Sequence, residues 1–420
     1  PLLTGITEPT GAQTTISYKV ASSYQNPDGT QASPQLPLPL HVVANVSVSD
    51  TVGSVTTSDT YFYKNGSYFY GGPFDRRFAG FGVITDTDAL GNVTTTYFHQ
   101  GNTTSNSAQG ENQDDEWKIG KVYRVEQRNS SNQLLQTTIN TWNDADLGHG
   151  NRFVYLSQTL VMHYGAGSSS HFDIATTYAY DNTTGNLLNK VDLGQVNGSD
   201  SGSVTDLGSD SLTTTYAYAA GTAPRLFLPD DQITTDSSAN KVRESRFYYD
   251  DLPFGSASLG NVTEEDDWIS GSTYAVTTKA YNSFGLITSA TDPDGHTTSY
   301  SYDSLNLYPA TVTNAANQAV QYLYDYTSGK ISQSTDPNGL VVQTVYDGMG
   351  RPLTVTESDP ANPASFVTRM SCVYTDLANA CAAHQTDYLD ASTAVDNYTY
   401  YDGLGRTLQV RKSSENAGTF

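Results

Sequence analysis

A Tyr-Asp pair followed by a glycine-containing turn recurs along the second half of this chain at a nearly constant interval. Four of its copies begin at Tyr281, Tyr302, Tyr324 and Tyr346, with Asn in place of Asp in the first, and they are separated by 21, 22 and 22 residues. A fixed period in this range is typical of repeat architectures, in which each unit contacts mainly its neighbours. The period therefore predicts a repeat architecture for this part of the chain, whatever its composition.

The residues of one unit explain why it repeats. Glycine adopts the positive φ that a tight hairpin requires, and in Asp-Pro-x-Gly the Asp caps the backbone while Pro fixes φ at the second position. Between turns, the alternation in Leu353–Thr356 directs side chains to opposite faces of a strand. Each tyrosine ring is expected to pack on its neighbours, with its hydroxyl hydrated or hydrogen-bonded. A hairpin this small has no core, so it must stack on the next one. The repeat-defining residues are Tyr281, Asp292, Gly295, Tyr302, Asp303, Tyr324, Asp325, Gly329, Asp336, Gly339, Tyr346, Asp347, Gly350, Arg351, Tyr401, Asp402, Gly405 and Arg406.

Composition agrees with an all-β chain. The 420 residues include 30 Tyr and only 3 Met, with abundant Thr, Ser, Asn and Gly, and helical blocks rich in Ala, Glu, Lys and Leu are missing. The formal net charge of −23 arises from few basic residues rather than from an acidic run. Such a surface repels phosphate backbones, which argues against nucleic-acid binding. The charge is interpreted as a solvated surface, with divalent-cation binding as the alternative.

The chain divides into three segments by pattern. Residues 1–75 form a β-rich segment preceding the repeats, 76–171 a transition block, and 172–420 the repeats, with inserts near 181–214 and 360–397. The insert at Leu377–His384 is predicted to contain one short helix. The Pro- and Gln-rich stretch Asn26–Pro39 is interpreted as a linker or a surface excursion. Strands are expected at Thr14–Val20, His41–Val48, Thr60–Tyr63, Gly82–Thr85, Val93–Phe98 and Lys121–Gln127.

Two cysteines, Cys372 and Cys381, are too few for a disulfide framework or a four-ligand zinc site. A local disulfide between them is predicted if the chain is exported, and two free thiols otherwise. No apolar run approaches membrane-spanning length, and no signal peptide is visible at the N-terminal end.

The repeat units, with Gly-x-[Leu/Ile] and Asp-Pro-x-Gly between the Tyr-Asp pairs, resemble the YD repeats of the RHS family. That family includes polymorphic toxins, the B and C components of insecticidal Tc toxin complexes, and teneurins. The block Arg76–Gly82, followed by Asp86–Asn92 and Tyr97–Gly101, is similar to the segment that precedes the repeats in RHS/Tc-B-like proteins. The opening Leu2-Leu3-Thr4 is similar to the same region. These matches cover most of the chain.

The resemblance implies a curved, spiralling β-sheet shell that encloses a C-terminal effector. An upstream β-propeller segment and a downstream self-cleaving motif with its effector are not seen, so the chain is expected to be a fragment that forms an open arc. Its expected partners are the rest of the same large polypeptide and that effector, with glycans or other surface proteins as further partners. Asp336–Leu340 superficially resembles the cleavage motif, but its place inside a regular repeat favours a turn. The expected location is secreted or at the cell surface.

Catalytic and cofactor motifs are not evident. The histidines show no metal-ligand spacing, no nucleophile elbow or nucleotide loop appears, and no cofactor, metal or catalytic residue is predicted. Cys372 with His384 is more simply a structural cysteine than a nucleophile pair. Three functions are weighed: a shell around an effector, a surface adhesin binding glycans through Tyr-rich strands, and a glycan-active β-solenoid enzyme. The first is favoured.

Overall fold

The computed structural model describes residues 2–8, 11–50, 55–102, 105–165, 167–221, 227–377, 380–390 and 392–413; the side chains of residues 363, 380 and 381 are not described. Within these ranges the chain is all-β, as predicted. Its only helical elements there are three short 3₁₀ turns, η1 (Ala21–Ser23), η2 (Ser107–Gln109) and η3 (Glu116–Lys118). No helix of the described chain is long and apolar enough to cross a bilayer.

The strands of residues 1–261 are β1 (Gly5–Thr7), β2 (Gln13–Val20), β3 (His41–Asp50), β4 (Val55–Tyr70), β5 (Arg76–Thr87), β6 (Val93–Phe98), β7 (Val122–Arg128), β8 (Leu134–Gly148), β9 (Asn151–Tyr164), β10 (His171–Tyr180), β11 (Leu187–Gly198), β12 (Val204–Asp206), β13 (Leu212–Tyr218), β14 (Ala220–Gly221), β15 (Pro229–Thr235), β16 (Lys241–Tyr249) and β17 (Ser256–Ala257). Those that follow are β18 (Val262–Ser270), β19 (Thr273–Tyr281), β20 (Ile287–Thr291), β21 (Thr297–Tyr302), β22 (Pro309–Thr313), β23 (Ala319–Asp325), β24 (Lys330–Thr335), β25 (Val341–Tyr346), β26 (Pro352–Asp359), β27 (Asn362–Leu377), β28 (Ala380–Tyr388), β29 (Ala394–Tyr401) and β30 (Thr407–Lys412).

The described strands form one 28-stranded sheet and one short parallel pair, β14 with β17. The large sheet is an antiparallel meander, because nearly every strand pairs with the strand that follows it in the sequence. Strand β11 is an exception, since both β12 and β13 pair with it. A meander of short hairpins is the arrangement that the 22-residue repeat predicts, since each hairpin makes mainly nearest-neighbour contacts.

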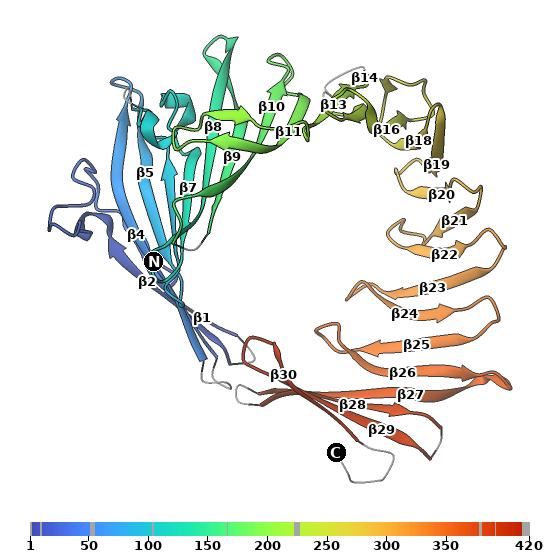
Figure 1. Ribbon diagram of the computed structural model, residues 1–420. Coiled ribbons are helices and arrows are strands. Elements are labelled where there is room, and N and C mark those ends of the chain that lie inside the picture. Colours follow the sequence, from blue (N-terminus) through green and yellow to red (C-terminus); the bar gives the residue numbers. More distant parts are fainter. Residues whose placement is uncertain are drawn as a thin grey trace.

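The meander bends around a wide central opening, so that its first and last strands approach each other (Figure 1). Strands β2 to β9 form one side of this ring, β19 to β26 the opposite side, and β27 to β30 return toward β1. Within the described residues β30 pairs only with β29 and β1 only with β2, so the sheet stays open and does not close into a barrel. The predicted open sheet is confirmed, although its two ends approach more closely than an arc implies.

Buried apolar residues are concentrated in the first two thirds of the chain. One cluster contains Ile139, Leu160 and Met162, which are almost completely buried between β8 and β9. Two smaller clusters centre on Phe81 and on Tyr249. In contrast, none of the residues from 267 to 357, all of which are described, is buried. The regular repeats are therefore a single layer without a core of their own.

Most expected strands are present, and the observed strands are often longer than predicted. Val93–Phe98 is found with those bounds as β6, whereas Thr60–Tyr63 lies inside the 16-residue β4. The stretch Asn26–Pro39 is a surface excursion that packs back on the sheet, because Leu36 lies in the same cluster as Phe81.

The insert containing the cysteines differs from its prediction. It forms the antiparallel pair β27 and β28 rather than a short helix. Cys381 lies opposite Asp376 in this pair, whereas the buried, free Cys372 lies opposite Gln385. Four residues along a strand correspond to about 13 Å, and a disulfide requires Cα atoms less than about 7 Å apart. The predicted disulfide does not fit this register.

Candidate functional site

The feature that distinguishes the repeats is the way in which each hairpin end is built and joined to the next. In the turn that begins at Asp347, one carboxylate oxygen accepts backbone N–H groups from Met349 at 2.8 Å and Arg351 at 2.9 Å. The backbone N–H of Gly350 donates to the carbonyl of Asp347 at 3.0 Å, and Gly350 has a φ of 74°. This is the three-residue hairpin loop in which a left-handed residue forms a bulge, and glycine adopts that conformation without steric cost.

The same construction recurs at both ends of the hairpins. At Asp292, as at Asp347, the carboxylate accepts the N–H groups two and four residues later. Asp336 and Asp402 show the same pattern, and Asp303 repeats it with Asn306 in the left-handed position. The glycines at the left-handed positions of these turns are Gly295, Gly339, Gly350 and Gly405. One local rule therefore builds the Tyr-Asp turns on one edge of the sheet and the Asp-Pro turns on the other.

The turn at Asp325 is one residue longer. Its carboxylate accepts the N–H of Thr327 and the hydroxyl of Ser328, and the N–H of Gly329 donates to the Asp325 carbonyl. Gly329 again has a positive φ, of 69°. The repeat thus tolerates a change in loop length, because the carboxylate still satisfies the backbone groups at the start of the turn.

These hydrogen bonds favour the ionised carboxylates. The N–H of His296 lowers the pKa of Asp292, and the N–H of Leu340 does the same for Asp336. The pKa of Asp347 is lowered by the N–H and then by the guanidinium of Arg351. A charged acceptor makes a stronger hydrogen bond than a neutral one, so each turn is most stable when its Asp is ionised.

In four of the repeat turns the tyrosine bonds to the preceding hairpin. The hydroxyl of Tyr302 donates to the carbonyl of Ile287 at 2.9 Å, and Ile287 is the first residue of the neighbouring strand β20. Equivalent bonds run from Tyr281 to Val262, from Tyr324 to Pro309 and from Tyr346 to Ile331, at 2.8, 3.0 and 2.8 Å. Tyr401 makes no such bond within the described chain. We call this bond the tyrosine clamp, because it joins successive turns along one edge of the sheet.

Arginine strengthens two of the Tyr-Asp turns. Arg351 donates to Asp347 at 2.7 Å and forms a bidentate pair with Asp376 on β27 through two 2.7 Å bonds. Its guanidinium also lies 4.1 Å from the ring centre of Tyr374. Arg406 forms the simpler 2.5 Å bond to Asp402. Bidentate pairing fixes orientation, so Arg351 connects a repeat turn to the longer strand beyond it.

The last Tyr-Asp turn contacts the other end of the sheet. The N–H of Gly403 donates to a carboxylate oxygen of Asp50 at 2.7 Å, and Asp50, at the end of β3, is only 2% exposed. A β-carbon on Gly403 would lie 2.9 Å from the backbone nitrogen of Ala12, closer than real contacts allow. This closure contact joins residues 353 positions apart in the chain. No local motif in the sequence signals this contact.

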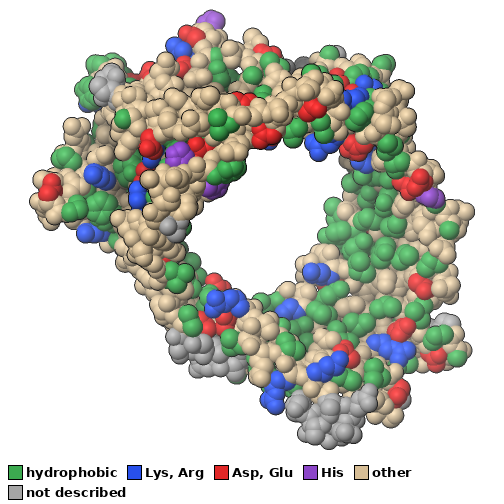
Figure 2. Space-filling view, viewed as in Figure 1, with side chains coloured by type: hydrophobic (Ala, Val, Ile, Leu, Met, Phe, Trp, Pro, Cys, Tyr) green, Lys and Arg blue, Asp and Glu red, His purple; other side chains and the backbone are tan. Residues whose placement is uncertain are grey.

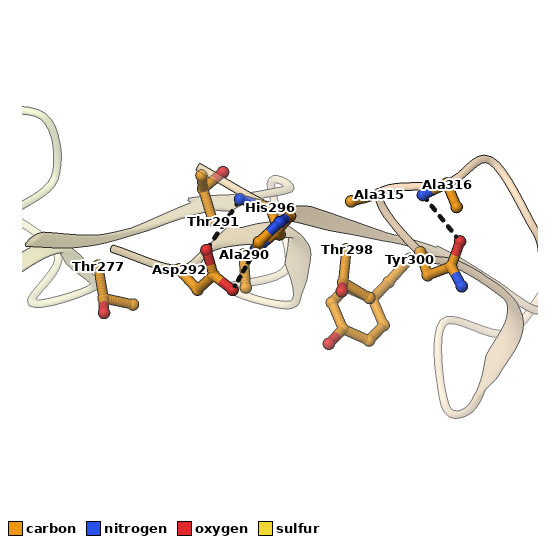
Figure 3. Close-up of a pocket in the computed structure, with 10 residues that line it drawn as sticks. Thr277, Ala290, Thr291, Asp292, His296, Thr298, Tyr300, Ala315 and Ala316 are labelled. Carbon is orange, nitrogen blue, oxygen red and sulfur yellow. Dashed lines mark hydrogen bonds and ion pairs between the residues drawn. The ribbon is translucent and has the colours of Figure 1, made fainter. Parts of the chain in front are cut away.

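An open pocket of about 640 Å³ lies on the repeat sheet (Figure 3). It is lined by Asp292, His296, Tyr300 and small residues of β19 to β21 and of the turn that follows β22. The imidazole of His296 lies 3.1 Å from the carboxylate of Asp292, and both side chains are exposed. Asp292 is the only carboxylate lining this pocket. A paired-carboxylate mechanism of glycan hydrolysis is therefore not assembled there.

Comparisons with known families agree with this geometry. Residues 1–108 match the family described as insecticide toxin TcdB middle/N-terminal region, and residues 281–319 match the RHS repeat. The resemblance to the RHS-repeat family is confirmed. No curated protein sequence matches the chain significantly.

Solved structures of TcdB2–TccC3 and of a Tc holotoxin pore share the fold. TcdB2–TccC3 superposes on 96% of this chain and on 29% of its own length, with a TM-score of 0.76 and 12% identity. The TcdB2–TccC3–Cdc42 structure gives a TM-score of 0.75 at 10% identity over 96% of this chain and 31% of its own. The Photorhabdus luminescens Tc holotoxin pore gives a TM-score of 0.75 at 11% identity over 98% of this chain and 30% of its own length. The chain thus spans about 30% of the length of these structures, and at such identity the likeness shows the fold alone.

Proposed function

We propose that this chain is a wall segment of a hollow shell, within a large RHS-type toxin protein that encloses and helps deliver a C-terminal effector. The observation that carries the proposal is the continuous meander bent into a ring around a wide opening (Figure 1). The shared fold with TcdB2–TccC3 over 96% of the chain supports it. The rest of the same polypeptide and its effector are the proposed partners, and the proposed location is secreted or cell-surface.

The single-layer construction of the repeats supports a wall rather than a self-contained domain. Hydrophobic side chains gather on the visible face of the arm that contains β22 to β27 (Figure 2). Leu323, Val345 and Val373 on these strands are between 57% and 63% exposed. Exposed apolar side chains that gather on one face are typical of a surface that contacts another body.

The two alternatives have less support. A glycan-binding row requires exposed aromatic side chains along one face, but the repeat tyrosines Tyr281, Tyr302 and Tyr324 are half-buried, with their hydroxyls bonded to backbone carbonyls. A glycan-active enzyme requires two carboxylates around one site, and the pocket beside His296 is lined by only one, Asp292.

Limited proteolysis of the complete gene product tests the proposal. A C-terminal domain inside a shell should resist added protease until the shell is denatured, while the same domain expressed alone is digested. The matched control is residues 1–420 mixed with the separate effector, which should give no protection. Equal digestion of the effector within the complete product and alone would contradict the shell function. Hydrolase activity of residues 1–420 that falls on replacing a single Asp or Glu would favour the enzyme instead.

A further inference from the structure

A buried group of three potential metal ligands lies outside the repeats, in the loop between β6 and β7. His99, Glu111 and Asp114 are all buried, and a donor atom from each lies within 4.8 Å of the others. The Nδ1 atom of His99 is 3.3 Å from a carboxylate oxygen of Asp114 and 3.7 Å from one of Glu111. Two buried carboxyl groups thus face one buried imidazole.

The imidazole is the decisive member of the group. The side chain of His99 is completely buried, and neither ring nitrogen has a hydrogen-bond partner. Buried polar atoms are nearly always satisfied, because an unsatisfied one loses its hydration without compensation. His99 is held in place by the ring of Tyr123, whose centre is 5.2 Å away. The Nδ1 atom of His99 therefore faces the two carboxyl groups without a hydrogen bond to either.

The carboxylates are fixed by the backbone rather than by the histidine. Asp114 accepts N–H groups from Gln100, Gly101 and Asn102 at 2.8–3.0 Å. One oxygen of Glu111 accepts the N–H of Asn106 at 2.6 Å, and its other oxygen is the one nearest His99. The site is preorganised, because these bonds set the carboxylate positions before any ligand arrives.

Nearby cations do not neutralise the group. The ammonium of Lys118, also buried, donates to the carbonyl of Gln113 at 2.8 Å and lies 3.6 Å from the carboxylate of Asp115. Donor atoms about 2.1 Å from a shared zinc ion are about 3.0 to 3.5 Å apart, close to the two separations observed here. One imidazole with two carboxylates suits a first-row divalent ion, whereas calcium prefers oxygen donors throughout.

We propose that His99, Glu111 and Asp114 bind one Zn²⁺ ion, which fixes the β6–β7 loop to the end of β6. A pocket of about 390 Å³, lined by Glu111 and Tyr123, adjoins the group. The role of the ion is structural, since it joins the end of β6 to a loop that contains only two single-turn 3₁₀ segments in its described part. The proposal is independent of the shell function.

Zinc titration of residues 1–420 tests it. After treatment with a chelator and dialysis, calorimetry with ZnCl₂ at pH 7 should show one tight equivalent, and zinc should raise the melting temperature. The variants His99→Phe, which keeps an aromatic ring against Tyr123, and Glu111→Gln, which keeps the bond from Asn106, should each weaken zinc binding at least about tenfold. His384→Phe is the matched control, since His384 pairs with one carboxylate, Asp396, at 2.8 Å; it should bind zinc like the native chain.

Three results would overturn the proposal. One is the absence of a tight equivalent in the native chain. Another is equal zinc affinity in the native, Glu111→Gln and His99→Phe proteins, which would place the ion elsewhere. The third is an NMR titration in which His99 stays a protonated imidazolium when zinc is present, since the group would then be a buried ion pair. If His99→Phe fails to fold, Glu111→Gln and the native titration still decide the question.

Discussion

Removing the tyrosine clamps should loosen the repeats without changing their packing. The perturbation is Tyr→Phe at Tyr302, Tyr324 and Tyr346, singly and together. Phenylalanine keeps the ring contacts, such as the stacking of Tyr324 on Tyr308 at 4.5 Å between centroids, and loses only the hydroxyl that donates to the previous strand. The expected change is therefore the net value of one hydrogen bond per unit.

Each lost bond should lower the local stability by about 1 kcal/mol, because the freed carbonyl is partly exposed and regains water. The opening constant of the affected strands then rises about fivefold per clamp. Clamps in separate units share no partner, so the triple variant should lose about 3 kcal/mol. An effect of this size is large for a segment in which no side chain between residues 267 and 357 is buried.

Hydrogen exchange followed by mass spectrometry measures this local opening directly, and it does not require the whole chain to unfold in one step. Peptides from β20 to β25 should exchange faster in the clamp variants. Tyr300→Phe and Tyr322→Phe are matched controls, because each lies two residues before a clamp tyrosine and its hydroxyl has no partner among the described residues. If hydrogen exchange were accelerated equally in the clamp and control variants, the clamp hydrogen bond would not stabilise the strands. The faster exchange would then follow from removing any tyrosine hydroxyl.

Other changes should act on the turns and on the closure of the ring. Asp50→Ala or Gly403→Val should broaden the distance distribution between spin labels on β3 and β30, because a buried, charge-assisted bond of about 1.5–3 kcal/mol is lost; an unchanged distribution would contradict the closure contact. Gly350→Ala should cost about 1–2 kcal/mol in urea unfolding because its φ is 74°, whereas Gly348→Ala, where a β-carbon meets open space, should cost less. The N–H of Ser392 lowers the pKa of Asp390 to about 2. A depressed folded pKa gives stability that is present above the unfolded value and lost as pH falls toward 2, so the melting temperature should fall between about pH 4 and 2. An unchanged melting temperature over this range would contradict the turn bonds.

The repeats were predictable because their chemistry is local. An Asp followed three residues later by Gly specifies the hairpin loop, and alternation specifies the strand, so the turns at Asp292, Asp336 and Asp347 could be placed from sequence. The acceptor of each tyrosine hydroxyl was not predictable in detail. It lies about 15 residues earlier, and it is specified by the register of two strands rather than by any nearby residue.

Features that depend on register or on distant segments were missed. Cys372 and Cys381 are nine residues apart, which suits a local disulfide, but residues pair across the β27–β28 turn only when they are equidistant from it. His99, Glu111 and Asp114 have no recognised motif spacing, and they meet because an irregular loop folds back over the end of β6. The contact of Asp50 with Gly403 depends on the curvature of the whole sheet.

The distribution of burial indicates how the ring is held together. The leading strands contain the clusters around Phe81 and Ile139, whereas the regular repeats depend on ladder hydrogen bonds, turn carboxylates and tyrosine clamps between neighbours. In a linear array of this kind the terminal units lack one neighbour and need a cap. The preceding strands provide that cap at the start of the repeats. At the far end the turn at Asp402–Arg406 contacts Asp50, so the same core-containing segment also supports the last hairpin. A wall without a core can therefore stay ordered, because both of its ends are attached to the part of the chain that has one.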